Sequence, residues 1–152
     1  MRGLSFIAYG ESFVVDVTLV QKVVRNIAVT PVPTAPPAVV GISNIKGRVI
    51  TVLSIAALFG RPRESAITAN AVIFKASTSG NDQMGLLIDK PGDLIDINDE
   101  RILPPPVTAT ADETSHISGV AEVGETLYRI IDVDSITNKF INSSNNPLVE
   151  GI

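Results

Sequence analysis

The segment VVGISNIKGRVITVLSIAALFG, residues 39–60, decides how this chain folds. Two apolar runs flank Lys46-Gly47, where a tight turn would join them as a hairpin. Gly41 interrupts the first run, although glycine weakens a strand interior and usually marks a bulge or a close backbone approach. After the second run, Ser54 can cap a short helix that Gly60 would end. The segment therefore predicts strand, turn, strand and short helix.

The second half of the chain repeats this plan. A shift of 78 residues aligns GISNIKGRVITVLSI with GVAEVGETLYRIIDV, so that Gly41 falls on Gly119 and most apolar positions coincide. In this second copy, Asp132 or Asp134 can cap a helix whose apolar residues recur at helical spacing. Such self-similarity indicates an internal repeat, and the pattern predicts two small β-barrels, each followed by a helix.

Each copy also has a predicted hairpin and a proline-rich loop upstream. The first hairpin joins strands at 4–9 and 12–17 through a Gly10-Glu11 turn, and the second joins strands at 70–76 and 83–89. Between hairpin and barrel, prolines would make stiff connections. Valine-rich residues 20–29 are predicted as strand, because β-branched side chains disfavour helix.

Composition excludes several classes of function. The chain has 152 residues, which suits one domain, and 45% of them are hydrophobic, as in a globular protein. It has no cysteine, so thiolate metal sites and cysteine nucleophiles are excluded. His116, its one histidine, is expected to be an ordinary loop or strand-edge residue. No apolar run reaches the length of a membrane span, and a cytoplasmic location is the simplest expectation.

Charge is distributed unevenly along the chain. No acidic residue occurs between Val17 and Arg63, whereas from Gly80 onward thirteen acidic residues face four basic ones. Two interpretations follow. The regions could face each other and neutralise, or the basic segment could form a positive surface for an acidic partner. The basic residues concerned are Lys22, Arg25, Lys46, Arg48, Arg61 and Arg63.

The residues in order resemble the CheW-like adaptors of chemotaxis. The resemblance rests on a signature in which two prolines precede the pattern GIxNIKGxVI. It extends to MGLLID, ILPPP and ISGVA in the second half of the chain. It implies an all-β fold of two interlocked, five-stranded, SH3-like barrels with short terminal helices. It also implies a single CheW-like domain over residues 1–152, with the second half of the repeat beginning near residue 70. The signature residues are Pro33, Pro36, Gly41, Ile42, Asn44, Ile45, Lys46, Gly47, Val49 and Ile50.

The resemblance implies a non-enzymatic function. Such a scaffold couples chemoreceptors to the histidine kinase CheA, through the kinase's regulatory domain and the receptor's cytoplasmic tip, and so meets the membrane only indirectly. No cofactor or metal is implied. The receptor-binding groove would then be formed by Val20, Lys22, Gly41, Asn44, Lys46 and Gly47.

Two of these residues carry specific expectations. Gly41 would let a partner helix approach the strand backbone. Lys22 stands where the family often has an acidic residue, so the groove is expected to be positive and to prefer a receptor tip with an extra acidic residue.

Three alternatives remain open from the residues alone. One is an auxiliary CheW-like adaptor of a separate receptor–kinase pathway. The second is a small β-barrel that binds nucleic acid, although the basic segment offers only Phe59 for base stacking. The third is an enzyme, for which the sequence shows no phosphate loop, nucleophile elbow or metal-ligand spacing.

Overall fold

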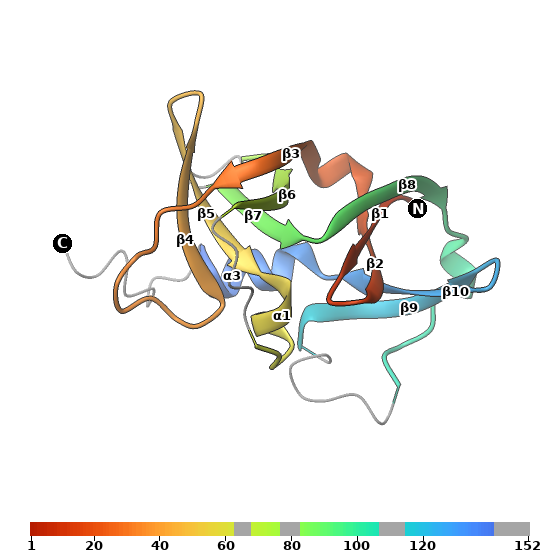
Figure 1. Cartoon of the computed structure of the whole chain (residues 1–152). Coiled ribbons are helices and arrows are strands. Elements are labelled where there is room, and N and C mark those ends of the chain that lie inside the picture. The colour runs from red at the N-terminus through yellow and green to blue at the C-terminus, as the bar shows by residue number, and fades with distance from the viewer. Residues whose placement is uncertain (63–67, 77–82, 107–114, 142–152) are drawn as a thin grey trace.

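The central part of the chain forms one five-stranded barrel. The structure is a computed structural model that describes residues 1–62, 68–76, 83–106 and 115–141 (Figure 1). Its first sheet has the order β3-β6-β7-β5-β4, and we call it the central barrel. Its strands are β3 (Val20–Ala28), β4 (Val39–Ile45), β5 (Arg48–Ser54), β6 (Thr68–Phe74) and β7 (Gln83–Ile88).

Strands from both sides of this central part form the second sheet. Its order is β8-β1-β2-β10-β9, and we call it the split barrel. Its strands are β1 (Arg2–Ala8), β2 (Glu11–Asp16), β8 (Lys90–Asp96), β9 (Ile117–Val123) and β10 (Thr126–Ile131). The β1–β2 turn falls at Tyr9-Gly10, one residue before the predicted position, because Glu11 already pairs with Ala8.

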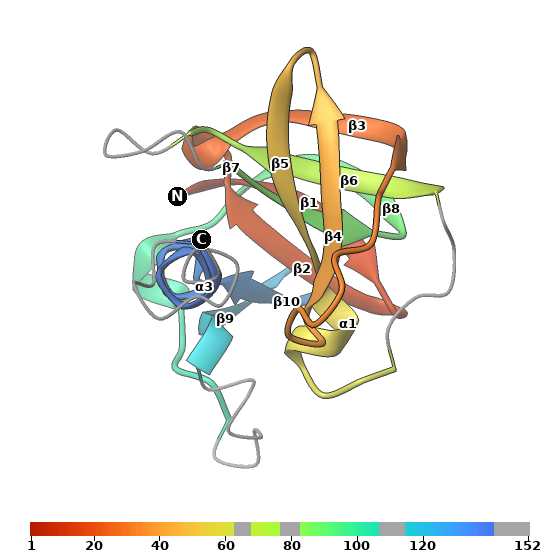
Figure 2. The same cartoon turned by 90° about the vertical axis from the view of Figure 1, so that its left-hand side faces the viewer.

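Both sheets close in the same way. Thr30, after β3, pairs with Ile42 of β4, and Leu103, after β8, pairs with Val120 of β9. Each sheet also contains one parallel junction, between β5 and β7 and between β10 and β2. Each hairpin is thereby built into the barrel of the other half: β1–β2 joins β8–β10, and β6–β7 joins β3–β5 (Figure 2). The predicted all-β fold of two interlocked, five-stranded barrels is confirmed.

Short helices begin at the predicted caps. α1 (Ile55–Leu58) starts at Ser54, whose Oγ accepts a hydrogen bond from the Ala57 N–H at 3.1 Å. α3 (Val133–Phe140) starts at Asp132, whose Oδ1 accepts from the Ser135 N–H at 3.0 Å. Each cap satisfies a backbone donor that has no partner inside the helix. Two single-turn 3₁₀ helices complete the described elements: η1 (Val17–Leu19) and η2 (Asp99–Arg101).

The largest core cluster lies between the barrels and joins them. It takes side chains from β1 and β2, from β5 to β7 and from both helices. Two smaller clusters fill the barrel interiors. Alternate residues of β6 belong to the shared core and to the interior of the central barrel: Ile73 faces that interior, whereas Phe74 faces the shared core. Burial on both faces explains the continuous apolar runs of β6 and β7.

Aromatic rings are few, and they gather in this shared core. Phe6, Phe13 and Phe59 stack in sequence with ring centroids 5.7 Å apart at each step. His116 lies against Phe59 and Phe140, and only 2% of it is exposed. His116 directly precedes β9, and its carbonyl accepts a hydrogen bond from the Asp132 N–H at 2.9 Å, as expected of a strand-edge residue. Its burial beside these two rings was not part of that expectation.

Candidate binding surface

The turn between β4 and β5 has the tight geometry that the sequence predicts. Ile45 and Arg48 pair across it, and φ is +52° at Lys46 and +83° at Gly47. Positive φ at both central residues is the type I′ geometry that matches the twist of a two-residue hairpin. The Asn44 Oδ1 accepts a hydrogen bond from the Gly47 N–H at 3.0 Å and so holds the turn.

Lys46 is not the residue that this turn position prefers. A left-handed conformation costs a residue other than glycine about 1–2 kcal/mol, and such positions are often functional. Lys46 and Arg48 are exposed, and 56% of Val49 is exposed. The turn thus presents two cations beside an apolar side chain, and we call Lys46, Arg48 and Val49 the basic tip.

Gly41 is buried, and a neighbouring segment of the same chain lies over it. A side chain there would collide with the Thr30 carbonyl oxygen, and it would lie 3.0 Å from the Pro31 Cα. Thr30 and Ile42 exchange two backbone hydrogen bonds of 2.8 and 2.9 Å at this point. The space over Gly41, where a partner helix was expected to approach, is therefore filled by the Thr30–Pro31 segment that closes the central barrel. Barrel closure requires a glycine here.

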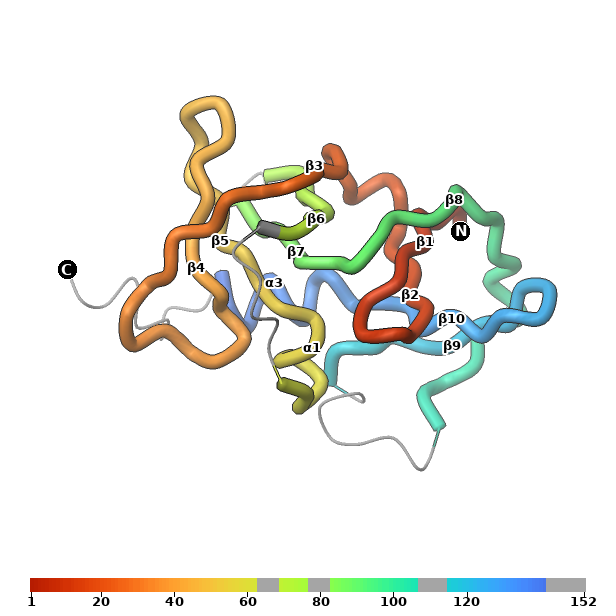
Figure 3. Tube along the Cα trace, viewed as in Figure 1, coloured from red at the N-terminus to blue at the C-terminus, as the bar shows by residue number. Residues whose placement is uncertain are grey.

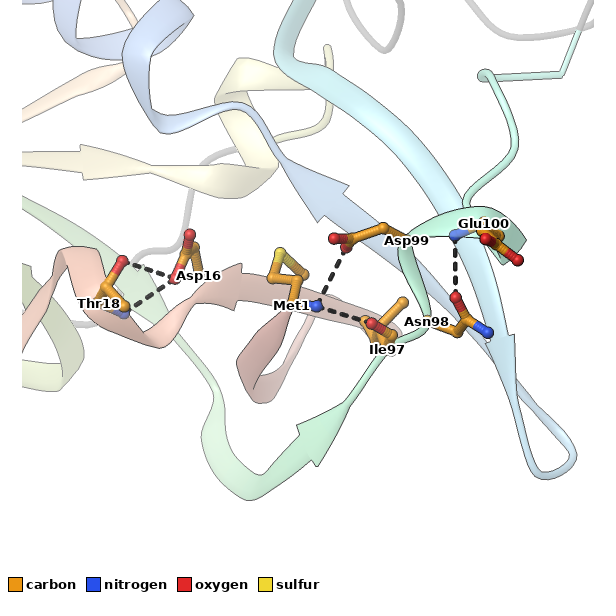
Figure 4. Close-up of polar contacts among 7 residues, drawn as sticks. All are labelled: Met1, Asp16, Thr18, Ile97, Asn98, Asp99 and Glu100. Carbon is orange, nitrogen blue, oxygen red and sulfur yellow. Dashed lines mark hydrogen bonds and ion pairs between the residues drawn. The ribbon is translucent and has the colours of Figure 1, made fainter.

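Val20 and Lys22 lie at the start of β3, just after η1. The Asp16 Oδ1 accepts hydrogen bonds from the Thr18 backbone N–H at 2.9 Å and from its hydroxyl at 2.8 Å, which fixes the chain direction into β3 (Figure 4). Val20 pairs with Phe74 of β6, and Lys22 pairs with Ile73. Both side chains are partly exposed.

A cavity of about 300 Å³ lies beside Val20, between the central barrel and α3. Leu19, which precedes Val20, and Phe74, which pairs with it, both line the cavity. Its walls are mainly apolar, as in many binding grooves. No local sequence pattern marks these walls, because their residues come from four elements distant in the chain: Thr18, Leu19, Phe74, Lys75, Ala76, Met84, Val133, Asp134, Thr137 and Ile141.

The six predicted groove residues lie on one barrel but in two groups. Val20 and Lys22 belong to β3, whereas Gly41, Asn44, Lys46 and Gly47 belong to β4 and its turn. Val20 and Lys22 lie at the start of β3, whereas the closing bridge joins Thr30, after the end of β3, to Ile42 of β4. In the first group, Val20 lies beside Leu19 and Phe74, which line the cavity, and the second group includes the projecting turn. The structure thus separates a cavity-side group from a tip-side group.

The basic side chains are not neutralised by the acidic half of the chain. Within the described ranges there are two ion pairs: Arg129 with Glu11 at 2.7 Å, and the Met1 amino group with Asp99 at 3.0 Å (Figure 4). Both lie in the split barrel or beside it. Neither involves Lys22, Arg25, Lys46 or Arg48, which leaves the central barrel with a positive surface. This agrees with the second interpretation of the charge pattern.

Other basic residues have different roles or are not described. The Arg61 guanidinium carbon lies 5.0 Å from the centroid of the Tyr9 ring, in a cation–π contact. Arg63 lies outside the described residues. In the part of the chain that the structure covers, no three His, Cys, Asp or Glu side chains are grouped to hold a metal ion. No helix there is long and apolar enough to cross a membrane.

Comparisons with known proteins identify one family. The model of the CheW-like domain matches residues 2–140. A chemotaxis protein CheW of Rhizobium meliloti (strain 1021) is 27% identical over 88% of this chain and 84% of that protein. The CheW of Klebsiella aerogenes is 23% identical over 98% of this chain and 86% of that protein. The CheW of Helicobacter pylori is 27% identical over 91% of this chain and 82% of that protein.

One solved structure of this kind has the same fold. It is the scaffolding protein TtCheW from Thermoanaerobacter tengcongensis, which matches with a TM-score of 0.74 and 26% sequence identity. The match covers 87% of this chain and 88% of that one. Both barrels are therefore within the matched region, and their SH3-like character is established.

Proposed function

The chain belongs to the CheW-like domain family, and from this we propose that it couples chemoreceptors to the histidine kinase CheA in chemotaxis. As a member of this family it is a chemotaxis adaptor and not an enzyme. The observation that carries the proposal is the family match over residues 2–140, which spans both barrels. The proposed partners are the regulatory domain of CheA and the cytoplasmic tip of a chemoreceptor. With these partners it would act in the cytoplasm and meet the membrane only through receptors.

We infer that the whole chain, 1–152, is one CheW-like domain whose second half begins near residue 70. The strand order supports this inference. β6 begins at Thr68 and takes the same place in the central barrel as β1 takes in the split barrel. The two halves have exchanged their hairpins, so neither half has a complete barrel without the other.

The receptor site is proposed to include Val20, Lys22, Gly41, Asn44, Lys46 and Gly47. Val20 adjoins the apolar cavity, and Asn44 and Gly47 hold the turn that exposes Lys46. Gly41 contributes by keeping the central barrel closed beneath this surface. Because Lys22 and Lys46 have no carboxylate partner within the described residues, an acidic side chain on the receptor tip would stabilise the complex.

Titration of the cognate receptor-tip fragment tests the role of Lys22. Lys22→Glu is expected to weaken binding and leave the melting temperature nearly unchanged, because each exposed charge pair contributes about 0.2–1 kcal/mol. Arg25→Glu is the matched control, since it makes the same charge change on the same strand outside the proposed site. Equal affinities of wild type and Lys22→Glu at low salt would remove Lys22 from the site.

Co-elution with the CheA regulatory domain tests the adaptor role itself. A mixture with both proteins folded is expected to give a complex in gel filtration, and addition of the receptor-tip fragment is expected to enlarge it. Failure to co-elute at concentrations of about tens of micromolar, above the range of most specific complexes, would contradict the coupling role.

Binding to random-sequence DNA and RNA distinguishes the nucleic-acid alternative. Phe59, the aromatic residue of the basic segment, is only 7% exposed and stacks on Phe13 in the core. It therefore offers no surface for base stacking. We expect no salt-dependent binding to either nucleic acid.

A further inference from the structure

Gln83 brings a polar side chain into an otherwise apolar strand. It opens β7, in which every residue is buried, and only 2% of it is exposed. Its Nε2 donates two hydrogen bonds, to the Gln21 Oε1 at 2.6 Å and to the Phe74 carbonyl oxygen at 2.8 Å. A carbonyl oxygen can only accept, which fixes the orientation of the amide. The side chain of Gln83 thus joins β3 to the end of β6.

The same amide group leaves its oxygen without a partner. The Gln83 Oε1 is buried, and no donor among the described residues lies within hydrogen-bond distance of it. A buried acceptor without a donor lowers the stability of a protein. An apolar side chain would avoid this cost, and residues that break such a local rule are typical of functional sites. The role of Gln83 therefore lies in the two hydrogen bonds that it donates.

Gln21, which accepts the first of these hydrogen bonds, is the extra residue of a β-bulge. β3 runs beside β6 (Figure 3), and Val20 pairs with Phe74. Lys22, two residues further along β3, pairs with Ile73, which is only one residue further along β6. Such a two-against-one match defines a bulge and locally disrupts the ladder. The buried amide binds the side chain of the extra residue and the carbonyl of Phe74, so it holds both sides of this bulge.

The bulge places Val20 and Lys22 on opposite faces of β3. In a regular strand, residues two positions apart lie on the same face. Residues that pair across two antiparallel strands also share a face. Phe74, opposite Val20, belongs to the shared core. Ile73, opposite Lys22, faces the interior of the central barrel. The bulge therefore determines which side of β3 presents the valine and which presents the cation.

We propose that Gln83 positions the cavity-side group of the receptor site, Val20 and Lys22, by fixing the bulge. This inference rests on the proposed function, since it takes these two residues as receptor contacts. Gln83 itself is buried and acts only through β3. Without its amide, Gln21 can enter the ladder opposite Ile73. A slip of one residue turns side chains to the opposite face, so Lys22 would leave the position that the receptor tip meets.

A double-mutant cycle on receptor affinity tests the proposal. Gln83→Met keeps the length of the side chain and removes both donors, whereas Gln21→Ala removes the acceptor at an exposed position. Each variant is expected to bind the cognate receptor-tip fragment about two- to tenfold more weakly, which is the range of one neutral hydrogen bond. The double variant should bind about as weakly as Gln83→Met, because both changes remove the same hydrogen bond. Additive losses would assign Gln21 a direct receptor contact and overturn the proposal.

Interstrand nuclear Overhauser effects measure the bulge itself, in the absence of the receptor. The wild type should show contacts between Lys22 and Ile73 and between Val23 and Val72. Gln83→Met and Gln21→Ala should lose the first contact and keep the second. A general loss of stability would instead weaken both contacts alike. Variants that keep the contact between Lys22 and Ile73 would overturn the proposal, whatever their affinity for the receptor tip.

Two further variants complete the experiment. Asn70→Ala is the matched control, because the Asn70 Nδ2 also donates to a backbone carbonyl, that of Asp89 at 3.0 Å, but near the other end of β6. It should change neither the bulge nor the affinity. Lys22→Glu separates the positioning role from the receptor site. If Lys22→Glu weakens binding and Gln83→Met does not, the receptor site stands and the positioning role is wrong. If neither weakens binding, the cavity-side group is not part of the receptor site, and both proposals fail there.

Discussion

The central barrel and the split barrel share one architecture and differ in their surfaces. Both have the same strand order, the same parallel junction and the same closing bridge, with Gly41 and Gly119 at matched positions. The ionisable residues of the central barrel strands and the β4–β5 turn are all basic, whereas the matching turn of the split barrel carries Glu122 and Glu125. Barrel closure and core packing therefore require the same residue types at matched positions in both barrels, whereas the charge of exposed positions can differ.

The largest predicted effect concerns barrel closure. Gly41→Ala should lower the free energy of unfolding by about 3 kcal/mol, because every atom that the new Cβ meets belongs to the Thr30–Pro31 backbone. Gly119→Ala should cost less, about 1–2 kcal/mol, since the nearest backbone atom, the Leu103 carbonyl oxygen, would lie 2.7 Å from the new Cβ and the other close contact is the movable Ile102 side chain. Urea unfolding of both variants gives the comparison. A smaller loss at Gly41 than at Gly119 would show that the bridges are not equivalent.

A Gly41 variant can lose receptor binding because its barrel opens, so stability and binding must be measured together. Gly41→Asp is expected to abolish receptor binding, but the structure attributes the loss to an opened central barrel and not to a blocked partner. Its melting temperature should therefore fall together with its affinity. A variant that keeps the wild-type melting temperature and loses binding would restore the interpretation of a direct contact.

The two turns should differ in their tolerance of side chains. Gly47→Ala should cost about 1–2 kcal/mol, because φ is +83° there and Lys46 already occupies a left-handed conformation. Asn44→Ala should cost about 1 kcal/mol through loss of the hydrogen bond to Gly47. The acidic turn has positive φ at one central residue, Gly124, so Glu125→Ala should be nearly neutral. Thermal melting of the three variants is the measurement, and a large loss for Glu125→Ala would contradict it.

The helix caps should contribute alike in the two halves. Ser54→Ala and Asp132→Ala should each destabilise the protein by about 1 kcal/mol, because each removes the acceptor of a helix N-terminal N–H. Asp132→Asn is the control that keeps a capping oxygen, and it should remain close to the wild type. Chemical denaturation measures all three. An Asp132→Asn variant as unstable as Asp132→Ala would assign the effect to charge and not to capping.

The smallest effect concerns a feature that the split barrel does not share with its counterpart. Arg129 pairs with Glu11 at 2.7 Å, whereas the 78-residue shift places uncharged Thr51 at the equivalent position. Because both side chains are partly exposed, a double-mutant cycle of Arg129→Gln and Glu11→Gln should give a coupling of about 0.2–1 kcal/mol. The coupling should shrink at high salt. A salt-independent coupling would contradict a solvent-screened pair.

Local features were predictable where the residues that determine them lie within one short segment. The tight turn at Lys46-Gly47 and the caps at Ser54 and Asp132 follow from neighbouring residues, and the structure confirms them. The six residues of the proposed site were predicted from the sequence only through its resemblance to a family. The sequence could not supply the cavity beside Val20, because the walls come from η1, β6, β7 and α3.

Long-range features depended on pairings between distant segments. The packing over Gly41 could not be predicted, because the Thr30 segment that covers it follows a different strand. The burial of His116 could not be predicted either, because the rings of Phe59 and Phe140 that lie beside it come from distant segments. The residues that neighbour Gly41 and His116 in the sequence show no pattern that would predict these contacts.

The sequence by itself determined the repeat, the strands, the turns, the caps and the uneven charge, because each depends on periodicity or on residues a few positions apart. Only the tertiary structure decided which hairpin joins which barrel, and that Gly41 lies where the central barrel closes. It also decided that the β4–β5 and β9–β10 turns lie at opposite ends of the molecule (Figure 3). The physical reason is that parallel junctions such as β2 with β10 pair residues more than a hundred positions apart, as Val14 and Ile130 do. Such pairings are selected by the shared core between the barrels and not by local preference.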